Sequence, residues 1–276
     1  FINRCNTITG KKTFAHRLEH PLPSREEIIT HQHAVQELAP KIDFRQHFQA
    51  SGMEIDEQTK DREQLLEWLQ HPSFLFGKKI HQVILVIVPV VTVALVIGWT
   101  ASPVFRPFAI LMAIFQWVFL GFYIKRINTF HEYIGRKKNI LQKYARLLHY
   151  LQSEKFTSAR MSALSNRAKN ADKKVAALAS LVHAFDARLN SMTTLIVNSM
   201  LLYDLQCVYR LEKWKEENKD NLQAWLEAAS ETEVLVSFGT FAFNQQHFVY
   251  PTIHEEMSIT ATSLGHPLIS HEENIT

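Results

Sequence analysis

Two adjacent apolar stretches constrain the fold of this chain more than any other feature of its sequence. Residues 80–105 contain no Asp, Glu, Lys or Arg, and after Arg106 a further 18 residues, 107–124, are also uncharged. A bilayer core of about 30 Å requires roughly 20 apolar residues in a helix, whereas an open pair of strands would leave backbone groups unsatisfied in lipid. The sequence therefore predicts a hairpin of two transmembrane helices that turns at residues 100–103. The alternative is a buried hairpin in a soluble core, but soluble cores rarely contain two such stretches in succession.

The charges beside these stretches indicate an orientation. Lys78 and Lys79 precede the first stretch, Lys125 and Arg126 follow the second, and Arg106 alone marks the turn. Because cytoplasmic loops carry an excess of Lys and Arg, we expect both flanks in the cytoplasm, in a multi-pass protein of an inner or plasma membrane. Membrane lipid is therefore the first partner that the sequence predicts.

The segment after the hairpin is strongly basic. Residues 125–174 hold 13 basic and 3 acidic side chains, whereas residues 175–276 hold 5 basic and 13 acidic ones. Each Lys or Arg near an anionic leaflet contributes about 1 kcal/mol of attraction, and the same charges would attract nucleic-acid phosphates. Few aromatic residues are interleaved, which weakens a model of base stacking. We favour lipid contact for Arg136, Lys137 and Lys138 and leave DNA as the open alternative.

The rest of the chain is expected to be mostly α-helical. No Pro or Gly lies between Gly135 and Gly239, which favours long helices. We expect one helix over residues 136–152 and another over 221–238, after a polar turn at 215–220. The expected apolar stripe of the first helix is Ile140, Leu141, Tyr144, Leu147, Leu148 and Leu151. A coiled-coil-like seam on one long helix is predicted from apolar residues at alternating spacings of four and three. These residues are Leu178, Val182, Phe185, Leu189, Met192 and Ile196.

Shorter elements are expected towards the two ends. Three helices are predicted near residues 9–19, 24–38 and 61–70, the second with Ser24 and Glu27 in a capping-box pattern. Residues 258–269 alternate apolar and polar side chains and predict a strand.

No motif indicates a complete catalytic site. The sequence Gly10-Lys11-Lys12-Thr13 lacks the earlier Gly of a phosphate-binding loop, because Cys5 occupies that position. We interpret Lys11 and Lys12 as a solvated helix face. Cys5 and Cys207 have no partner at metal-binding spacing.

Histidines are the remaining candidates for metal ligands. His16 and His20 have a spacing of four residues, and His31 and His33 lie close together, but the chain contains no His-Glu-x-x-His motif. We interpret these histidines as surface residues and expect this chain to hold no cofactor and no metal.

Short motifs near the two ends of the chain are similar to one family. The N-terminal ones look like the opening of a core domain, and the C-terminal ones look like its return helix and the threshold of an ATPase domain. The residues that carry this pattern are Asn3, Thr7, Gly10, Pro21, Glu231, His266 and Pro267. Together they resemble the MutS family, the ATPases of DNA mismatch repair and their relatives.

The resemblance implies an organisation and a function. Residues 1–79 would form the N-terminal helical part of a MutS-like core, 80–124 the hairpin, 125–255 the lever-like helices and return helix, and 256–276 the start of an ATPase domain. The chain begins at Phe1, and we expect it to be a fragment of a longer protein. That parent would bind ATP and Mg, contact DNA and form a homodimer through its ATPase domain. The alternative is a membrane-bound coiled-coil scaffold with no link to ATP or DNA.

Overall fold

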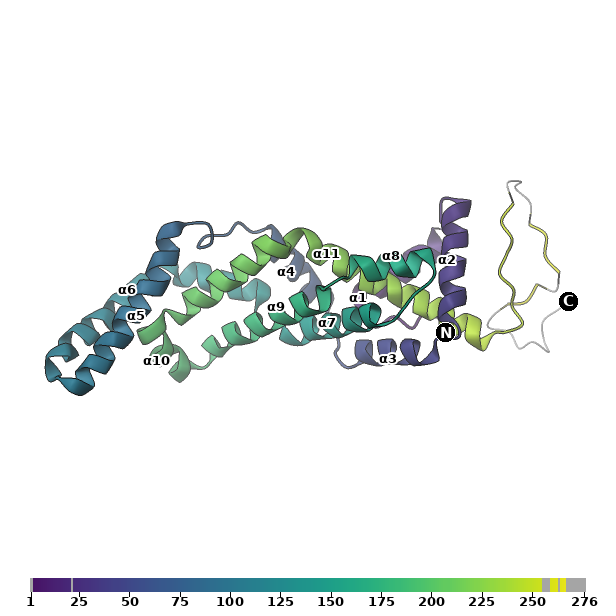
Figure 1. Ribbon diagram of the computed structural model, residues 1–276. Coiled ribbons are helices and arrows are strands. Elements are labelled where there is room, and N and C mark those ends of the chain that lie inside the picture. Colours follow the sequence, from purple (N-terminus) through teal and green to yellow (C-terminus); the bar gives the residue numbers. More distant parts are fainter. Residues whose placement is uncertain (1, 21, 255–258, 263, 267–276) are drawn as a thin grey trace. The chain divides into compact units, whose positions relative to one another are not determined.

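The structure is a computed structural model that describes residues 2–20, 22–254, 259–262 and 264–266. These residues are predominantly α-helical and include no strand (Figure 1). They form two compact units, each assembled from separate segments of the chain. The terminal unit comprises Phe1–Met53, Tyr150–Arg167 and Ala228–Thr276, and the hairpin unit comprises Glu54–His149 and Ala168–Glu227.

The terminal unit is built from short helices around the last part of a long one. Its elements are α1 (Ile8–Glu19), α2 (Arg25–Leu38), α3 (Ile42–Met53), α8 (Ala159–Arg167) and the end of α11 (Tyr203–Asn244). The hydroxyl of Thr7 caps α1 by accepting a hydrogen bond from Gly10 N (2.9 Å), and Ser24 caps α2 through Glu27 N (3.2 Å). The predicted helices near 9–19 and 24–38 are thus confirmed, whereas α3 was not predicted.

Aromatic side chains make much of the terminal unit's core. The rings of Phe14 and Phe238 stack with centroids 5.2 Å apart, beside buried Cys5 and Val234. This contact packs α1 against α11.

The hairpin unit contains the longest apolar helices. Its elements are α4 (Thr59–Gln70), α5 (Lys79–Ala101), the 3₁₀ turn η1 (Pro103–Phe105), α6 (Arg106–Ile134), most of α7 (Lys138–Ser153), α9 (Ala171–Asp186), the 3₁₀ turn η2 (Ala187–Leu189), α10 (Ser191–Leu201) and the first part of α11. Helices α5 and α6 lie side by side, and α10 contacts both (Figure 1). The predicted helix near 61–70 corresponds to α4.

Helices α5 and α6 are long and apolar enough to cross a membrane. Only 17% of the most apolar window of each helix is buried, whereas a core helix of a soluble protein would be mostly covered. Their turn follows Ala101, as predicted, but α6 continues past residue 124 to Ile134. Val86 and Phe122, which are 63% and 78% exposed, illustrate the uncovered apolar surface of the hairpin.

The predicted helix at 136–152 is confirmed as α7. Its expected apolar stripe is buried at every position, namely Ile140, Leu141, Tyr144, Leu147, Leu148 and Leu151.

The predicted coiled-coil seam on one long helix is wrong. Leu178, Val182 and Phe185 are buried on α9, but the helix ends at Asp186. Met192 and Ile196 lie on the separate helix α10 and are 70% and 57% exposed. The hydroxyl of Thr194 donates a 2.6 Å hydrogen bond to the carbonyl of Arg188, a local contact that competes with helical pairing and stabilises the break.

Two other sequence interpretations need correction. The polar turn expected at 215–220 does not occur, because α11 is one helix of 42 residues through this stretch. Lys215 there is buried, and its Nζ donates a 2.6 Å hydrogen bond to the carbonyl of His71. The predicted strand at 258–269 is not seen in residues 259–262 and 264–266, and its other positions lie outside the described residues.

Candidate functional site

The main candidate site surrounds Glu233 of α11, at the N-terminus of α1. The Oε1 atom of Glu233 accepts hydrogen bonds from the backbone N–H groups of Asn6 (2.8 Å) and Thr7 (3.1 Å), and Oε2 accepts one from the Thr7 hydroxyl. Glu233 is only 3% exposed. A carboxylate is favourable here because unpaired N–H groups and the helix dipole leave positive potential at a helix N-terminus.

Gly10 is required by the closeness of this contact. A Cβ atom added to Gly10 would overlap Glu233 Oε2 and would lie 2.9 Å from Thr7 Oγ1. Thr7 and Gly10, two residues of the N-terminal motif, thus lie directly against α11.

Glu231, two residues before Glu233, forms a second polar cluster. Its Oε1 lies 3.3 Å from Arg17 Nη2, 3.1 Å from His31 Nε2 and 3.0 Å from Arg160 Nη2, and its side chain is 13% exposed. Burial alone would raise the pKa of Glu231, but the hydrogen bond to His31 and the charges of Arg160 and Arg17 outweigh it and lower the pKa to about 2. The carboxylate therefore stays ionised and joins α1, α2 and α8 to α11.

This cluster corrects one interpretation of the histidines. His31 is an internal partner of Glu231 with its side chain only 14% exposed, whereas His16, His20 and His33 are exposed as expected. The stacked rings of His16 and His20 lie 4.4 Å apart. Within the described residues no group of three His, Cys, Asp or Glu is arranged to hold a metal ion.

Two other motif residues, Asn3 and His266, lie in the described part of the chain. The side chain of Asn3 accepts a 2.9 Å hydrogen bond from the backbone of Cys5 and so shapes the approach to α1. His266 is exposed in irregular chain, and Pro21 and Pro267 lie outside the described residues.

A cavity of about 620 Å³ adjoins the Glu231 cluster. Arg17 and His31 line it together with apolar side chains such as Val35, Phe238 and Tyr250. Its walls come from α2, the end of α11 and the segment that follows α11.

Nucleophilic and phosphate-binding roles find no support near α1. Residues 10–13 lie within α1, with Lys11 and Lys12 exposed as expected of a solvated face. Burial raises the pKa of Cys5 to about 12 and that of Cys207 to about 11, and a protonated thiol is a poor nucleophile.

The residues that flank the hairpin are exposed. Lys78, Lys79, Lys125 and Arg126 all present their side chains to the surroundings. At the turn, the guanidinium of Arg106 lies 5.6 Å from the centre of the Trp99 ring, a cation–π distance.

The three basic residues after the hairpin, 136–138, lie in different environments. Lys137 is buried, and its Nζ lies 2.6 Å from Asp61 Oδ1 and 2.9 Å from Gln64 Oε1. The expectation of lipid or phosphate contact for Lys137 is therefore corrected, because its charge is used inside the hairpin unit. Arg136 is exposed and Lys138 is half-buried, so these two remain candidates for such contact.

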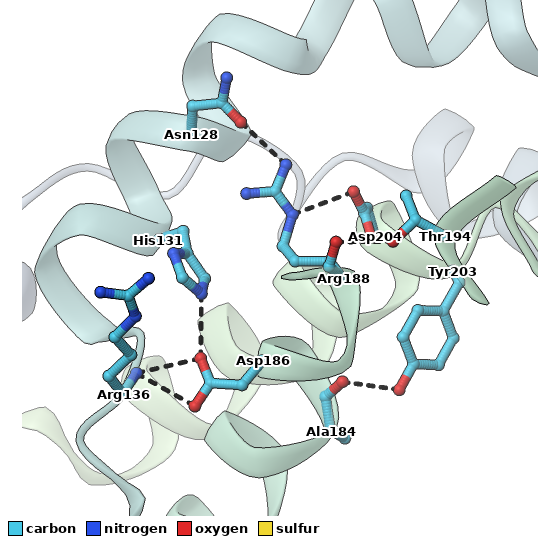
Figure 2. Close-up of polar contacts among 9 residues, drawn as sticks. All are labelled: Asn128, His131, Arg136, Ala184, Asp186, Arg188, Thr194, Tyr203 and Asp204. Carbon is cyan, nitrogen blue, oxygen red and sulfur yellow. Dashed lines mark hydrogen bonds and ion pairs between the residues drawn. The ribbon is translucent and has the colours of Figure 1, made fainter. Parts of the chain in front are cut away.

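A polar cluster at the end of α6 was not predicted from the sequence. Asp186 Oδ1 accepts hydrogen bonds from His131 Nε2 (2.9 Å) and from the backbone N–H of Arg136 (3.0 Å), as Figure 2 shows. Nearby, Arg188 bonds both Asp204 Oδ2 (3.1 Å) and Asn128 Oδ1 (2.8 Å) (Figure 2). The cluster holds α9 and the start of α11 against the base of the hairpin.

Glu212 of α11 holds the segment that leads into the hairpin. Its carboxylate accepts hydrogen bonds from three successive backbone N–H groups, those of Phe74 (2.7 Å), Leu75 (2.9 Å) and Phe76 (2.7 Å). Glu212 has no exposed surface. No local sequence signal identifies this site, because its partners lie far from it along the chain.

Comparison of the chain with models of known protein families, with curated proteins and with solved structures finds no match.

Proposed function

We propose that this chain is the helical core and lever of a membrane-anchored MutS-like protein, with a mechanical rather than a catalytic role. The observation that carries the proposal is the contact of the two distant motifs. Thr7 and Gly10 of the N-terminal motif lie against Glu233, and Glu231 of the C-terminal motif lies beside it on α11. Residues more than 200 positions apart thus form a site at which both halves of the resemblance meet.

The geometry of α11 supports the lever. Glu212 of this helix holds the backbone that leads into α5, and Glu233 holds the N-terminus of α1. A displacement of α11 along its axis would act directly on both segments, because each is attached through charge-assisted hydrogen bonds, which are among the stronger ones in proteins.

The anchor is supported by the exposed apolar surface of α5 and α6. We propose a multi-pass arrangement in an inner or plasma membrane, with both flanks of the hairpin in the cytoplasm. We propose that the exposed Arg136 and the half-buried Lys138 contact anionic lipid. In the proposed parent protein, ATP and Mg would bind to an ATPase domain that also forms a homodimer, and DNA would be a partner.

The alternative of a coiled-coil scaffold is less well supported. A coiled-coil scaffold would be supported by an apolar seam that continues to Ile196. The buried part of the seam ends at Phe185, one residue before the end of α9.

Hydrogen exchange on the product of the complete gene, reconstituted in liposomes, tests the lever. We expect a non-hydrolysable ATP analogue with Mg²⁺ to change the protection of the amides of Thr7 and Leu75, which Glu233 and Glu212 hold. Exposed amides at the start of α2 serve as the control. ATP binding without any change at Thr7 and Leu75 would contradict the lever, and absence of ATP binding would favour the scaffold.

A further inference from the structure

Helix α10 and its turn into α11 carry a sequence with almost no charge. Between Leu189 and Tyr209 the only charged residue is Asp204. Asp204 is 1% exposed, and its Oδ2 lies 3.1 Å from Nε of Arg188. The charge is therefore paired inside the hairpin unit, and no charged side chain of this stretch faces outward.

Helix α10 lies along α6 over its full length. Just before α10, Arg188 bonds Asn128 of α6 (2.8 Å), and towards its other end Ser199 Oγ accepts a 2.8 Å hydrogen bond from Trp117 Nε1. At a rise of about 1.5 Å per residue, α10 is roughly 16 Å long, and Asn128 and Gln116 are about 18 Å apart along α6. The two lengths agree with α10 running beside α6 from the base of the hairpin to Gln116.

Gln116 marks the middle of the apolar part of α6. It lies about 15 Å from Arg106 and about 14 Å from Lys125 along the helix axis. If these two charges mark the two faces of a bilayer core of about 30 Å, Gln116 lies near the midplane.

At this depth the turn between α10 and α11 has hydrogen-bonded N–H groups at Leu202 and Asp204. Leu202 has a left-handed conformation (φ 50°) that ends α10, and its N–H donates a 3.2 Å hydrogen bond to Gln116 Oε1. The N–H of Asp204 donates to Asn198 Oδ1 (2.9 Å). Gln116 and Asn198 are 0% and 1% exposed. Irregular backbone at membrane depth is tolerated where protein groups bury and satisfy it, and Gln116 and Asn198 do so for these two N–H groups.

The outer face of α10 is apolar and uncovered by the described part of the chain. Met192, Leu195 and Ile196 are 70%, 54% and 57% exposed, and Leu201 is 36% exposed. Helix α6, which α10 contacts, also exposes apolar side chains such as Val118, which is 56% exposed.

We propose that α10 and its turn into α11 form a re-entrant element, which enters the bilayer from the same side as the hairpin flanks and returns near the midplane. The face of α10 then contacts the acyl chains of the same membrane. The inference rests on the proposed membrane anchor and extends it, because the chain would contribute three membrane-embedded segments rather than two.

Fluorescence quenching in liposomes of phosphatidylcholine and phosphatidylglycerol tests this element. Single cysteines at Met192, Ile196 or Leu201 would carry an environment-sensitive dye, with background labelling of buried Cys5 and Cys207 measured on the unaltered protein. Lipids with a nitroxide near the headgroup or near the acyl-chain end quench at shallow or deep positions. Cysteines at Val86 and Gln223 serve as the hairpin control and the aqueous control.

We expect blue-shifted emission at Ile196, quenching of Met192 mainly by the shallow nitroxide and of Leu201 mainly by the deep one. Equal, shallow quenching of Met192 and Leu201 would overturn the proposal, because α10 would then lie flat at the interface. Blue-shifted emission at Ile196 without lipid quenching would also overturn it, because another protein surface would cover the helix.

The hairpin control separates this inference from the proposed anchor. A dye at Val86 in lipid with a dye at Ile196 in water would reject the re-entrant element and leave the anchor intact. Water exposure at Val86 would reject the anchor and the element together.

Discussion

Gln116 donates a 2.6 Å hydrogen bond from Nε2 to Thr92 Oγ1, and both side chains are buried where α5 and α6 meet. Thr92 in turn donates to the carbonyl of Val88 (2.8 Å), and Gln116 Oε1 accepts from Leu202 N. A polar group buried among apolar helices has no water to replace a lost partner. The contact therefore favours one register of α5 against α6 and also positions α10.

Replacement of Gln116 by Leu tests this polar contact. The change removes both hydrogen bonds of the Gln116 side-chain amide, including the one that the Leu202 N–H donates to it. The detergent-solubilised protein should therefore lose about 1–2 kcal/mol of unfolding free energy. Denaturant titration measures the loss. The matched control is Gln82→Leu, because Gln82 is exposed and its side-chain amide donates a 2.8 Å hydrogen bond to the Tyr209 hydroxyl. Equal losses in the two variants would show that burial of Gln116 adds nothing.

The orientation of the hairpin is testable by cysteine labelling in sealed membranes. A membrane-impermeant maleimide added outside should react with a cysteine at Ser102, beside the turn, and not with one at Ser73 or Ser153. The buried thiols of Cys5 and Cys207 give the background. Reaction of all three positions from the same side would contradict a membrane-spanning hairpin.

Glu231 should make stability depend on acid pH. Its pKa falls from 4.5 to about 2 on folding, so its contribution is fully present above pH 4.5 and is lost as the pH falls towards 2. The shift corresponds to an upper limit of about 3 kcal/mol. Unfolding curves of the wild type and Glu231→Gln should differ most near neutral pH and converge in acid. Glu227→Gln, at an exposed position of the same helix, should give a difference that does not vary with pH in this way.

Gly10→Ala should destabilise the terminal unit. The added methyl group would overlap the carboxylate of Glu233, and a forced shift in a packed site costs typically about 1–3 kcal/mol. Gly121→Ala is the control, since a Cβ there meets nothing within 4 Å, and thermal unfolding compares the two.

A double-mutant cycle identifies the cause of that loss. In a Glu233→Ala background the methyl group at Gly10 has room, so its cost should fall. An unchanged cost would assign the effect to the helix backbone and contradict the contact with Glu233.

Lys137 and Arg136 should respond differently to neutralisation. Lys137→Met removes the partner of Asp61 and should cost about 1–3 kcal/mol, whereas Arg136→Gln, at an exposed position, should change stability by no more than about 0.5 kcal/mol. Denaturant unfolding of both variants measures the difference. A stable Lys137→Met protein would restore Lys137 as a candidate for lipid contact.

Some features of this protein follow from composition and periodicity alone. The absence of charge over 80–105 and 107–124 was sufficient to predict the two apolar helices. The apolar stripe of α7 was also predicted at every position from Ile140 to Leu151, because a period of 3.6 residues directly defines one face of a helix. Caps such as Ser24 were readable because donor and acceptor lie within one turn.

Periodicity did not distinguish a covered face from an uncovered one. Phe185 and Met192 have the same spacing in the predicted seam, but one is buried and the other exposed. The stretch from Leu189 to Tyr209 carries a readable signal, a single charged residue, and the proposed membrane contact of α10 depends on it.

The sequence by itself determined where the apolar helices lie and which face of α7 is buried, because both depend on neighbours within a few turns. Only the tertiary structure decided that Glu233 pairs with Thr7 across 226 positions, that Glu212 holds Leu75, and that Lys137 is buried against Asp61. An isolated carboxylate or ammonium group in a sequence is equally compatible with solvent and with a buried partner. The choice between them depends on which backbone N–H groups and charges the folded chain brings within about 3 Å, because hydrogen bonds act only at that range.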